Sequence, residues 1–353
     1  MVEDFASLKG TLAEEEKKIL DEIYEKKTIE IKERLQEEIR RDNEHLALVN
    51  LCYNLFTKTT EINRITGYKI VLADPLCTLG ARNFDLMLYN EGNQNAILIE
   101  AKSSVSERGM GNMIDETIHA ANEVISNKEK LENILGSKMN KIEFVILSFA
   151  YYVNSLKQIV GSKNAPICLW AYHVVPGLIQ MVKTGEDIAS EKVAGRTHED
   201  EDMRQILLKG IPTRMGSLRS LPIMPTSHMF TKLEYIAQQL FILLDRKPQN
   251  ERWFGYSEVY NLCKQAFSAT ELDDSQVEEE TKKIIGSAID DGLFRKISED
   301  EEISQTEFDI SYIRRDYEKF LKDYLERRAK EKAFSAAIEE FGQKKGLKKL
   351  NEF

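Results

Sequence analysis

The fold is decided by two neighbouring segments, NFDLMLY at residues 83–89 and ILIEAK at residues 97–102. Each is an apolar run of the kind that forms a buried strand, and the polar residues between them are typical of a turn. Three charged residues nevertheless stand inside these runs: Asp85, Glu100 and Lys102. Residues two apart on a strand point to the same face, so Glu100 and Lys102 project together. Pairing of the two strands would then bring Asp85 beside Glu100.

This arrangement indicates metal chemistry. Two carboxylates repel each other strongly when they are removed from water, and a bound divalent cation is the usual relief. Oxygen ligands favour a hard cation, so we expect Mg²⁺ or Mn²⁺. Lys102 can then orient or help to deprotonate a water on the metal and stabilise the charge that grows on a phosphate. The alternative is a buried ion-pair network of Asp85, Glu100 and Lys102 in a sheet without catalytic activity.

The surrounding pattern predicts one sheet flanked by helices. A strand at 68–76 precedes the two segments and forms an antiparallel meander with them. A helix is expected before the meander and another after it, and two further buried strands complete the sheet. The expected ranges are 43–60 and 113–135 for the helices, and 142–153 and 167–175 for the later strands. This order predicts an α/β or α+β domain, which we place at residues 43–200.

The order of the elements and the spacing of Asp and Glu-x-Lys resemble the PD-(D/E)xK nuclease superfamily, the restriction-endonuclease-like proteins. That superfamily has an αβββαβ core with an Asp on the second strand and a Glu-x-Lys on the third. The resemblance covers residues 43–175. It implies a nuclease that requires a divalent metal, with Asp85 and Glu100 as metal ligands and Lys102 beside the attacking water. The proline that usually stands next to the Asp is absent, and the sequence reads Asn-Phe there.

Many members of the superfamily also have a Glu on the first core helix. Glu44 precedes the apolar run at 45–49 and matches that position, so the resemblance implies a third metal ligand at Glu44. A negative charge is also favoured in the first turn of a helix, which explains a Glu at this position without any metal.

The segments on either side of the sheet domain differ in charge. Residues 1–42 are predicted to be a helical extension, because charged residues surround a thin stripe of Ile and Leu at helical spacing. Residues 201–230 are predicted to be a basic linker between two domains. The candidates in this stretch for contact with nucleic acid are Arg204, Lys209, Arg214 and Arg219. A flexible linker without such contact is the alternative.

Residues 231–300 are predicted to be a winged-helix-like domain, in which three helices are followed by a glycine and a short strand. Such folds often bind DNA through the third helix. Here that helix begins among acidic residues, which repel phosphates, so packing or protein interaction is favoured. Residues 301–353 are predicted to hold a long C-terminal helix, from about 309 to 342, and a basic tail. Its aromatic stripe indicates a homodimer contact through Tyr317, Phe320, Tyr324, Phe334 and Phe341.

The composition limits the classes of function. With 49 basic against 59 acidic residues the net charge is −10, so any nucleic-acid surface must be a local patch. The sequence has no apolar run that could span a membrane and no signal peptide, which predicts a cytoplasmic protein. Without a glycine-rich phosphate-binding motif, no nucleotide cofactor is expected. The 4 Cys and 5 His are scattered and indicate neither a disulfide framework nor a zinc site.

The leading interpretation is a metal-dependent deoxyribonuclease, most simply an endonuclease, for which the resemblance implies a role in restriction or other defence against foreign DNA. The second is a regulator that binds DNA or protein through the winged-helix-like domain and carries an inactive nuclease-like sheet. The third is a nuclease that acts on RNA, because nothing in the residues separates DNA from RNA.

Overall fold

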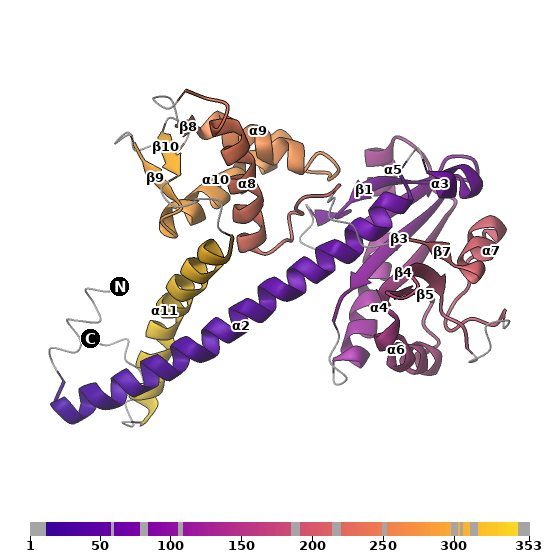
Figure 1. Ribbon diagram of the computed structural model, residues 1–353. Coiled ribbons are helices and arrows are strands. Elements are labelled where there is room, and N and C mark those ends of the chain that lie inside the picture. Colours follow the sequence, from indigo (N-terminus) through magenta and orange to yellow (C-terminus); the bar gives the residue numbers. More distant parts are fainter. Residues whose placement is uncertain are drawn as a thin grey trace. The chain divides into compact units, whose positions relative to one another are not determined.

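The computed structural model describes residues 12–57, 60–77, 84–104, 109–184, 191–213, 220–248, 253–297, 303, 306–310 and 317–344 (Figure 1). The chain divides into two compact units. The sheet unit comprises residues 41–227 and 260–281, and the helical unit comprises residues 1–40, 228–259 and 282–353.

The described chain begins with a long helix, α2 (Glu14–Leu55), drawn in indigo in Figure 1. The sequence predicted two helices that meet near residue 42, and this division is wrong. Residues 40–45 read RRDNEH and contain neither proline nor glycine, so no strong helix breaker stands there. The acidic residues of the first turn lie where the helix dipole favours negative charge.

The predicted antiparallel meander is confirmed. A short helix, α3 (Glu61–Thr66), follows α2 and ends at Gly67, whose φ of 73° lies in the left-handed region that glycine adopts readily. β1 (Tyr68–Ala73) pairs with β2 (Leu86–Asn90), and β2 pairs with β3 (Asn95–Lys102), both antiparallel.

The sheet continues with parallel strands. β4 (Lys141–Phe149) pairs with β3, and β5 (Ile167–His173) pairs with β4. β6 (Leu178–Met181) and β7 (Ile211–Pro212) then extend the sheet with antiparallel pairing. Among the described residues the strand order is β1-β2-β3-β4-β5-β6-β7. The protein is therefore a mixed α and β protein, in agreement with the predicted α/β (α+β) class.

The predicted strand at 142–153 is too long. β4 ends at Phe149, and a helix that the sequence analysis missed, α6 (Ala150–Lys163), begins at the next residue. Its buried residues Val153, Leu156 and Val160 are spaced three and four apart, as on one face of a helix. Parallel strands need a crossover connection, and α6 supplies it between β4 and β5.

Helices cover both faces of the sheet. The predicted helix at 113–135 is divided into α4 (Met110–Ser126) and α5 (Lys128–Leu135). Residues of α4, α5 and α6 form a core with one face of the sheet, and the C-terminal part of α2 packs on the other face. Each face thus has its own apolar core.

The predicted basic linker at 201–230 is in part a structured piece of the sheet unit. Residues 201–209 form α7 (Glu201–Lys209), which is followed at once by β7. Met203 and Leu207 of α7 are fully buried in the core of the sheet unit. The helix was missed because its sequence, EDMRQILLK, has only two turns of apolar spacing.

The helical unit contains α8 (Met229–Leu244) and a small antiparallel sheet. Among the described residues this sheet has the order β8-β10-β9, from β8 (Phe254–Gly255), β10 (Glu307–Ile310) and β9 (Phe294–Lys296). Two further predicted helices are present as α9 (Tyr256–Ala266) and α10 (Asp274–Asp290). The boundaries between the compact units fall within these two helices, so the predicted domain at 231–300 is not one compact unit.

The last helix is α11 (Tyr317–Lys344), and the residues before it include β10, so the predicted helix start near 309 is wrong. Its aromatic stripe is covered within the helical unit. Phe320 stacks on Phe230 of α8 with ring centroids 4.9 Å apart, and Phe341 packs with Leu20 of α2. The predicted dimer contact assumed that this stripe has no partner within the chain. Because Phe320 and Phe341 pack within the helical unit, that assumption is largely removed. Among the described residues, no helix has the length and apolar character needed to cross a membrane.

Candidate active site

Asp85 is held directly before β2 by hydrogen bonds of its backbone and of its carboxylate. Its backbone N–H donates to the Ile99 carbonyl oxygen at 2.9 Å, and its Oδ2 accepts from the Ala101 N–H at 2.6 Å. Its Oδ1 lies 2.8 Å from Nε2 of His45 on α2. The register Leu86↔Ile99, continued by one residue, sets Asp85 opposite Glu100. The predicted neighbourhood of the two carboxylates is thus present.

Glu100 and Lys102 project from β3 on the face that packs against α4. Lys102 Nζ donates to Glu100 Oε1, and their side chains are 29% and 15% exposed respectively. Both line a hollow of about 240 Å³, together with Phe84 of the preceding segment and residues of α4, including Glu116 and Thr117. The paired charges therefore face a space that a small group could enter.

Burial and mutual repulsion perturb the acids and bases of this site. Burial raises the pKa of Glu100 to about 7, and the charge of Asp85 adds to this, although Lys102 opposes it. Burial also pulls down the pKa of Lys102, but the charges of Glu100 and Asp85 outweigh it and the pKa is raised. Burial likewise opposes the charge on His45, yet Asp85 raises the pKa of His45 to about 9.

The sequence analysis chose Glu44 as the third acidic member of this site, but His45 is the α2 residue that hydrogen-bonds to Asp85. A signal for His45 was present. It stands three, four and seven residues before Leu48, Val49 and Cys52, which are all fully buried, so it lies on the inward stripe of the helix. A histidine at the start of such a stripe points toward the sheet. Glu44 itself is only partly buried.

The donor set suits a hard cation. Asp85 and Glu100 supply carboxylate oxygens from adjacent segments of the sheet, and the pKa of Glu100 is raised chiefly by burial, with a further contribution from the charge of Asp85. Among the described residues no three His, Cys, Asp or Glu side chains are already arranged to hold a metal ion. In this structure one oxygen of Asp85 contacts His45, and one oxygen of Glu100 accepts from Lys102.

Of the four predicted nucleic-acid contacts, the two that the structure describes, Arg204 and Lys209, are not brought to this site. Arg204 lies on α7, where it pairs with Glu201 of the same helix, and Lys209 is the last residue of that helix. α7 packs near β6, and β4 and β5 separate β6 from β3. Arg214 and Arg219 lie outside the described residues.

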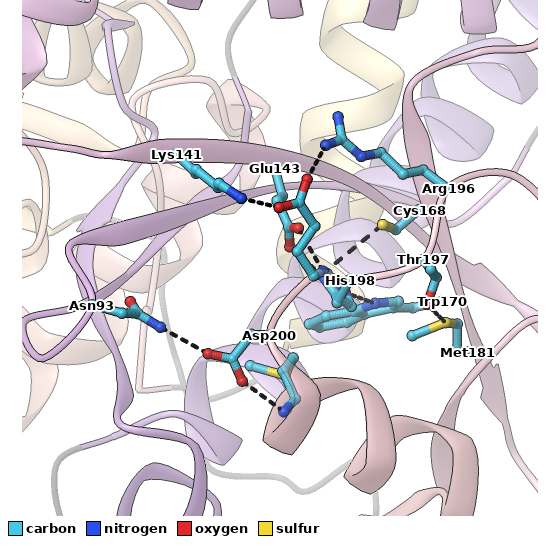
Figure 2. A network of polar contacts seen from close by, with 12 residues as sticks. Asn93, Lys141, Glu143, Cys168, Trp170, Met181, Arg196, Thr197, His198 and Asp200 are labelled. Atoms are coloured by element: carbon cyan, nitrogen blue, oxygen red, sulfur yellow. Dashed lines mark hydrogen bonds and ion pairs between the residues drawn. The ribbon is translucent and has the colours of Figure 1, made fainter.

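A second buried polar network lies elsewhere in the sheet unit (Figure 2). His198 is fully buried between Glu143 of β4 and Trp170 of β5. Its Nδ1 lies 2.5 Å from a Glu143 oxygen, and its Nε2 accepts the indole N–H of Trp170 at 2.9 Å. The other oxygen of Glu143 accepts the Glu199 N–H at 3.0 Å. Because indole can only donate, the ring proton of His198 is on Nδ1.

This network is structural. Burial alone would raise the pKa of Glu143, but the hydrogen bonds that its carboxylate accepts from His198 and from the Glu199 N–H lower it below the ordinary value. The segment that carries His198 also approaches β5 closely, since a Cβ on Gly195 would lie 2.5 Å from the Ile167 carbonyl oxygen. The network thus fastens residues 191–200 across β4 and β5, and its polar atoms satisfy one another.

Comparison with known proteins adds one relative. The chain is 27% identical to a protein of Archaeoglobus fulgidus over 346 residues, which cover 92% of this chain and 93% of the relative. That relative is described only as an uncharacterized protein. No family model and no solved structure matches the chain. The similarity along nearly the whole length indicates that the sheet unit and the helical unit occur together in the archaeal protein as well.

Proposed function

We propose that the protein is a metal-dependent nuclease of the PD-(D/E)xK type, which hydrolyses phosphodiester bonds. The observation that carries the proposal is the placement of Asp85, Glu100 and Lys102 on adjacent strands, with both carboxylates largely buried and paired with cations. The order α2, β1, β2, β3, α4, β4 is also the αβββαβ order of that superfamily's core. A restriction-endonuclease-like core is accordingly part of the proposal.

In this mechanism Asp85 and Glu100 would hold Mg²⁺ or Mn²⁺, and the bound cation would supply an acidified water and neutralise charge on the phosphate. Lys102 stays protonated at neutral pH because its pKa is raised, so it acts as a charge beside the phosphate and as a hydrogen-bond donor that orients the attacking water. His45 fixes the orientation of the Asp85 carboxylate, and the Ala101 N–H holds its other oxygen.

DNA is the proposed substrate, because the PD-(D/E)xK superfamily that the chain resembles commonly acts on DNA. Restriction or another form of defence is the proposed biological role. The segment that carries α8, α9, α10 and the small antiparallel sheet is proposed to be winged-helix-like and to serve recognition or protein contact. RNA remains the second substrate to be tested, because nothing in the residues of the site separates DNA from RNA.

The test is incubation of the purified chain with plasmid, linear duplex, single-stranded DNA and RNA, in Mg²⁺, Mn²⁺ or chelator. We expect cleavage with metal only, and its loss in Glu100→Gln and in Lys102→Ala. Lys69 of β1 and Glu91 form a similar ion pair on the same sheet away from the site, so Lys69→Ala and Glu91→Gln are the matched controls and should cleave normally. Full activity in a folded Glu100→Gln or Lys102→Ala variant would refute the assignment.

A further inference from the structure

An exposed aromatic stack lies at the end of β4. The Tyr151 side chain is 65% exposed, and its ring stacks on Phe149 with centroids 5.3 Å apart and planes 11° from parallel. Tyr152 lies against Tyr151 with centroids 4.5 Å apart, and Phe149 contacts Tyr172 of β5. Phe149 and Tyr172 are buried, so the stack rests on the core and presents the Tyr151 ring to solvent in a fixed orientation.

The stack lies at the same end of the sheet as the candidate active site, although Phe149 and Tyr172 belong to the core on the other face of the sheet from Glu100 and Lys102. Lys102 of β3 pairs with Ser148 of β4, whose Oγ donates to the Lys102 carbonyl oxygen at 2.8 Å. Ser148 is three residues before Tyr151, which is at most about 10 Å of chain, and adjacent strands lie about 4.8 Å apart. The Cα atoms of Lys102 and Tyr151 are therefore within about 15 Å, a distance that a few nucleotides of a bound strand span.

The charge around the stack suits a polyanion. Acidic residues number 59 among 353, yet residues 144–185 contain neither Asp nor Glu. The exposed side of α6 continues from Tyr151 with Asn154 and Gln158, which are neutral hydrogen-bonding residues. Among the described residues, Lys157 of the same helix pairs with no carboxylate. Residues 144–185 themselves bring no negative charge to this surface, and Asp115 of α4, which packs against α6, is paired with Lys163 of α6.

We propose that Tyr151 stacks an unpaired nucleobase of the strand bound at the active site, so that the preferred substrate is single-stranded or locally unpaired nucleic acid. This inference rests on the proposed nuclease function and specifies its substrate class. Bases in a duplex have their faces covered by their neighbours, whereas a single strand offers a free face to an aromatic ring. The ring of Phe149 behind Tyr151 holds it in place, which reduces the entropy lost when a base is stacked.

The test measures binding, independently of cleavage, by fluorescence anisotropy of a labelled single-stranded oligonucleotide in chelator. The full chain is compared with Tyr151→Ala, with Tyr151→Phe and with Val175→Ser, a control that changes an 87% exposed apolar residue after β5. Tyr151→Ala should weaken single-strand binding about 5- to 150-fold, the usual range for one stacked base. Tyr151→Phe should bind within about twofold of the parent, because the ring is retained, and Val175→Ser should be unaffected. Thermal melts establish that each variant is folded.

The outcomes separate this inference from the nuclease proposal. If the parent cleaves nucleic acid but Tyr151→Ala binds single strands as well as the parent does, the stacking role is refuted and the nuclease stands. Equal loss of duplex and single-strand binding in Tyr151→Ala, or equal loss in Val175→Ser, would also refute it, since a general apolar contact surface for protein would then be indicated. If the parent neither binds nor cleaves any nucleic acid, both proposals fail.

Discussion

The pair formed by His45 and Asp85 should make the stability of the metal-free protein depend on pH. Asp85 raises the pKa of His45 to about 9, against an ordinary value of 6.5. This difference corresponds to about 3 kcal/mol of unfolding free energy, because the folded state binds the imidazole proton more tightly than the unfolded state does. The contribution is fully present below pH 6.5 and is lost as the pH rises through 9.

His45→Gln isolates this contribution, since glutamine keeps an N–H that can donate to Asp85 but does not titrate. Urea unfolding of the parent and the variant, each in chelator, should give a difference in unfolding free energy of up to about 3 kcal/mol at pH 6. That difference should shrink steadily between pH 6.5 and pH 10. A constant difference across this range, or an NMR titration that places the pKa of His45 near 6.5, would show that the imidazole is not held by Asp85. Added Mg²⁺ should lower that pKa, because a cation and an imidazolium compete for the same carboxylate.

Asp85→Ala should destabilise the metal-free protein by about 1–3 kcal/mol, because it removes the hydrogen bonds to the partly buried His45 ring and to the Ala101 N–H; an unchanged urea midpoint would contradict the hydrogen bonds described. Replacement of both Arg214 and Arg219 with Ala should weaken nucleic-acid binding and make the binding constant less dependent on salt, as measured by anisotropy at several salt concentrations. If parent and variant show the same salt dependence, residues 201–230 only connect the domains and do not contact nucleic acid. If both strands of a partly unpaired duplex are cut, two sites of this kind must act together, and light scattering at micromolar concentration should then show a homodimer. Because Phe320 of α11 already packs within its own unit, we expect the Phe320→Ala variant to stay dimeric. Dissociation of this variant into monomers would show that α11 forms the dimer interface after all.

The centre of the fold could be predicted because its signals are local. The two apolar runs at residues 83–89 and 97–102 and the polar turn between them were enough to predict β2, β3 and their antiparallel pairing. They also predicted the position of Asp85 relative to Glu100. These features depend on residues close together in the chain. The same holds for α8, α9 and α10, whose apolar spacing and flanking turns predicted their existence and approximate ends.

The missed features depend on contacts that are distant in sequence. The residues after Phe149 read AYYVNS, a β-like run, and a helix forms there because Val153 and Leu156 find a core with α4 and the sheet. β10 has few residues and exists through its pairing with β8, about 50 residues earlier in the chain. His45 enters the site because α2 continues without a break and its C-terminal part packs on the sheet; the helical spacing indicates the inward direction of His45 but not that its partner is Asp85.

The two tryptophans of the chain fall one in each unit, and their surroundings differ. Trp170 is fully buried in β5, whereas Trp253 of the helical unit is 39% exposed, with Lys247 Nζ 5.2 Å from its ring centroid. An indole in an apolar interior fluoresces at shorter wavelength than one in water. Trp253→Phe therefore leaves a fluorophore that monitors only the sheet unit, and Trp170→Phe leaves one that monitors only the helical unit.

Denaturant titration of these two variants, corrected for the stability change that each substitution causes, measures the cooperativity of the chain. Coincident transitions would mean that the two units unfold in one cooperative transition, coupled by α2, α9 and α10, whose residues are divided between the units. Separate transitions would mean that these helices can fray at the boundary while one unit stays folded. The placement of two side chains thus lets ordinary fluorescence report whether the protein unfolds as one cooperative body or as two.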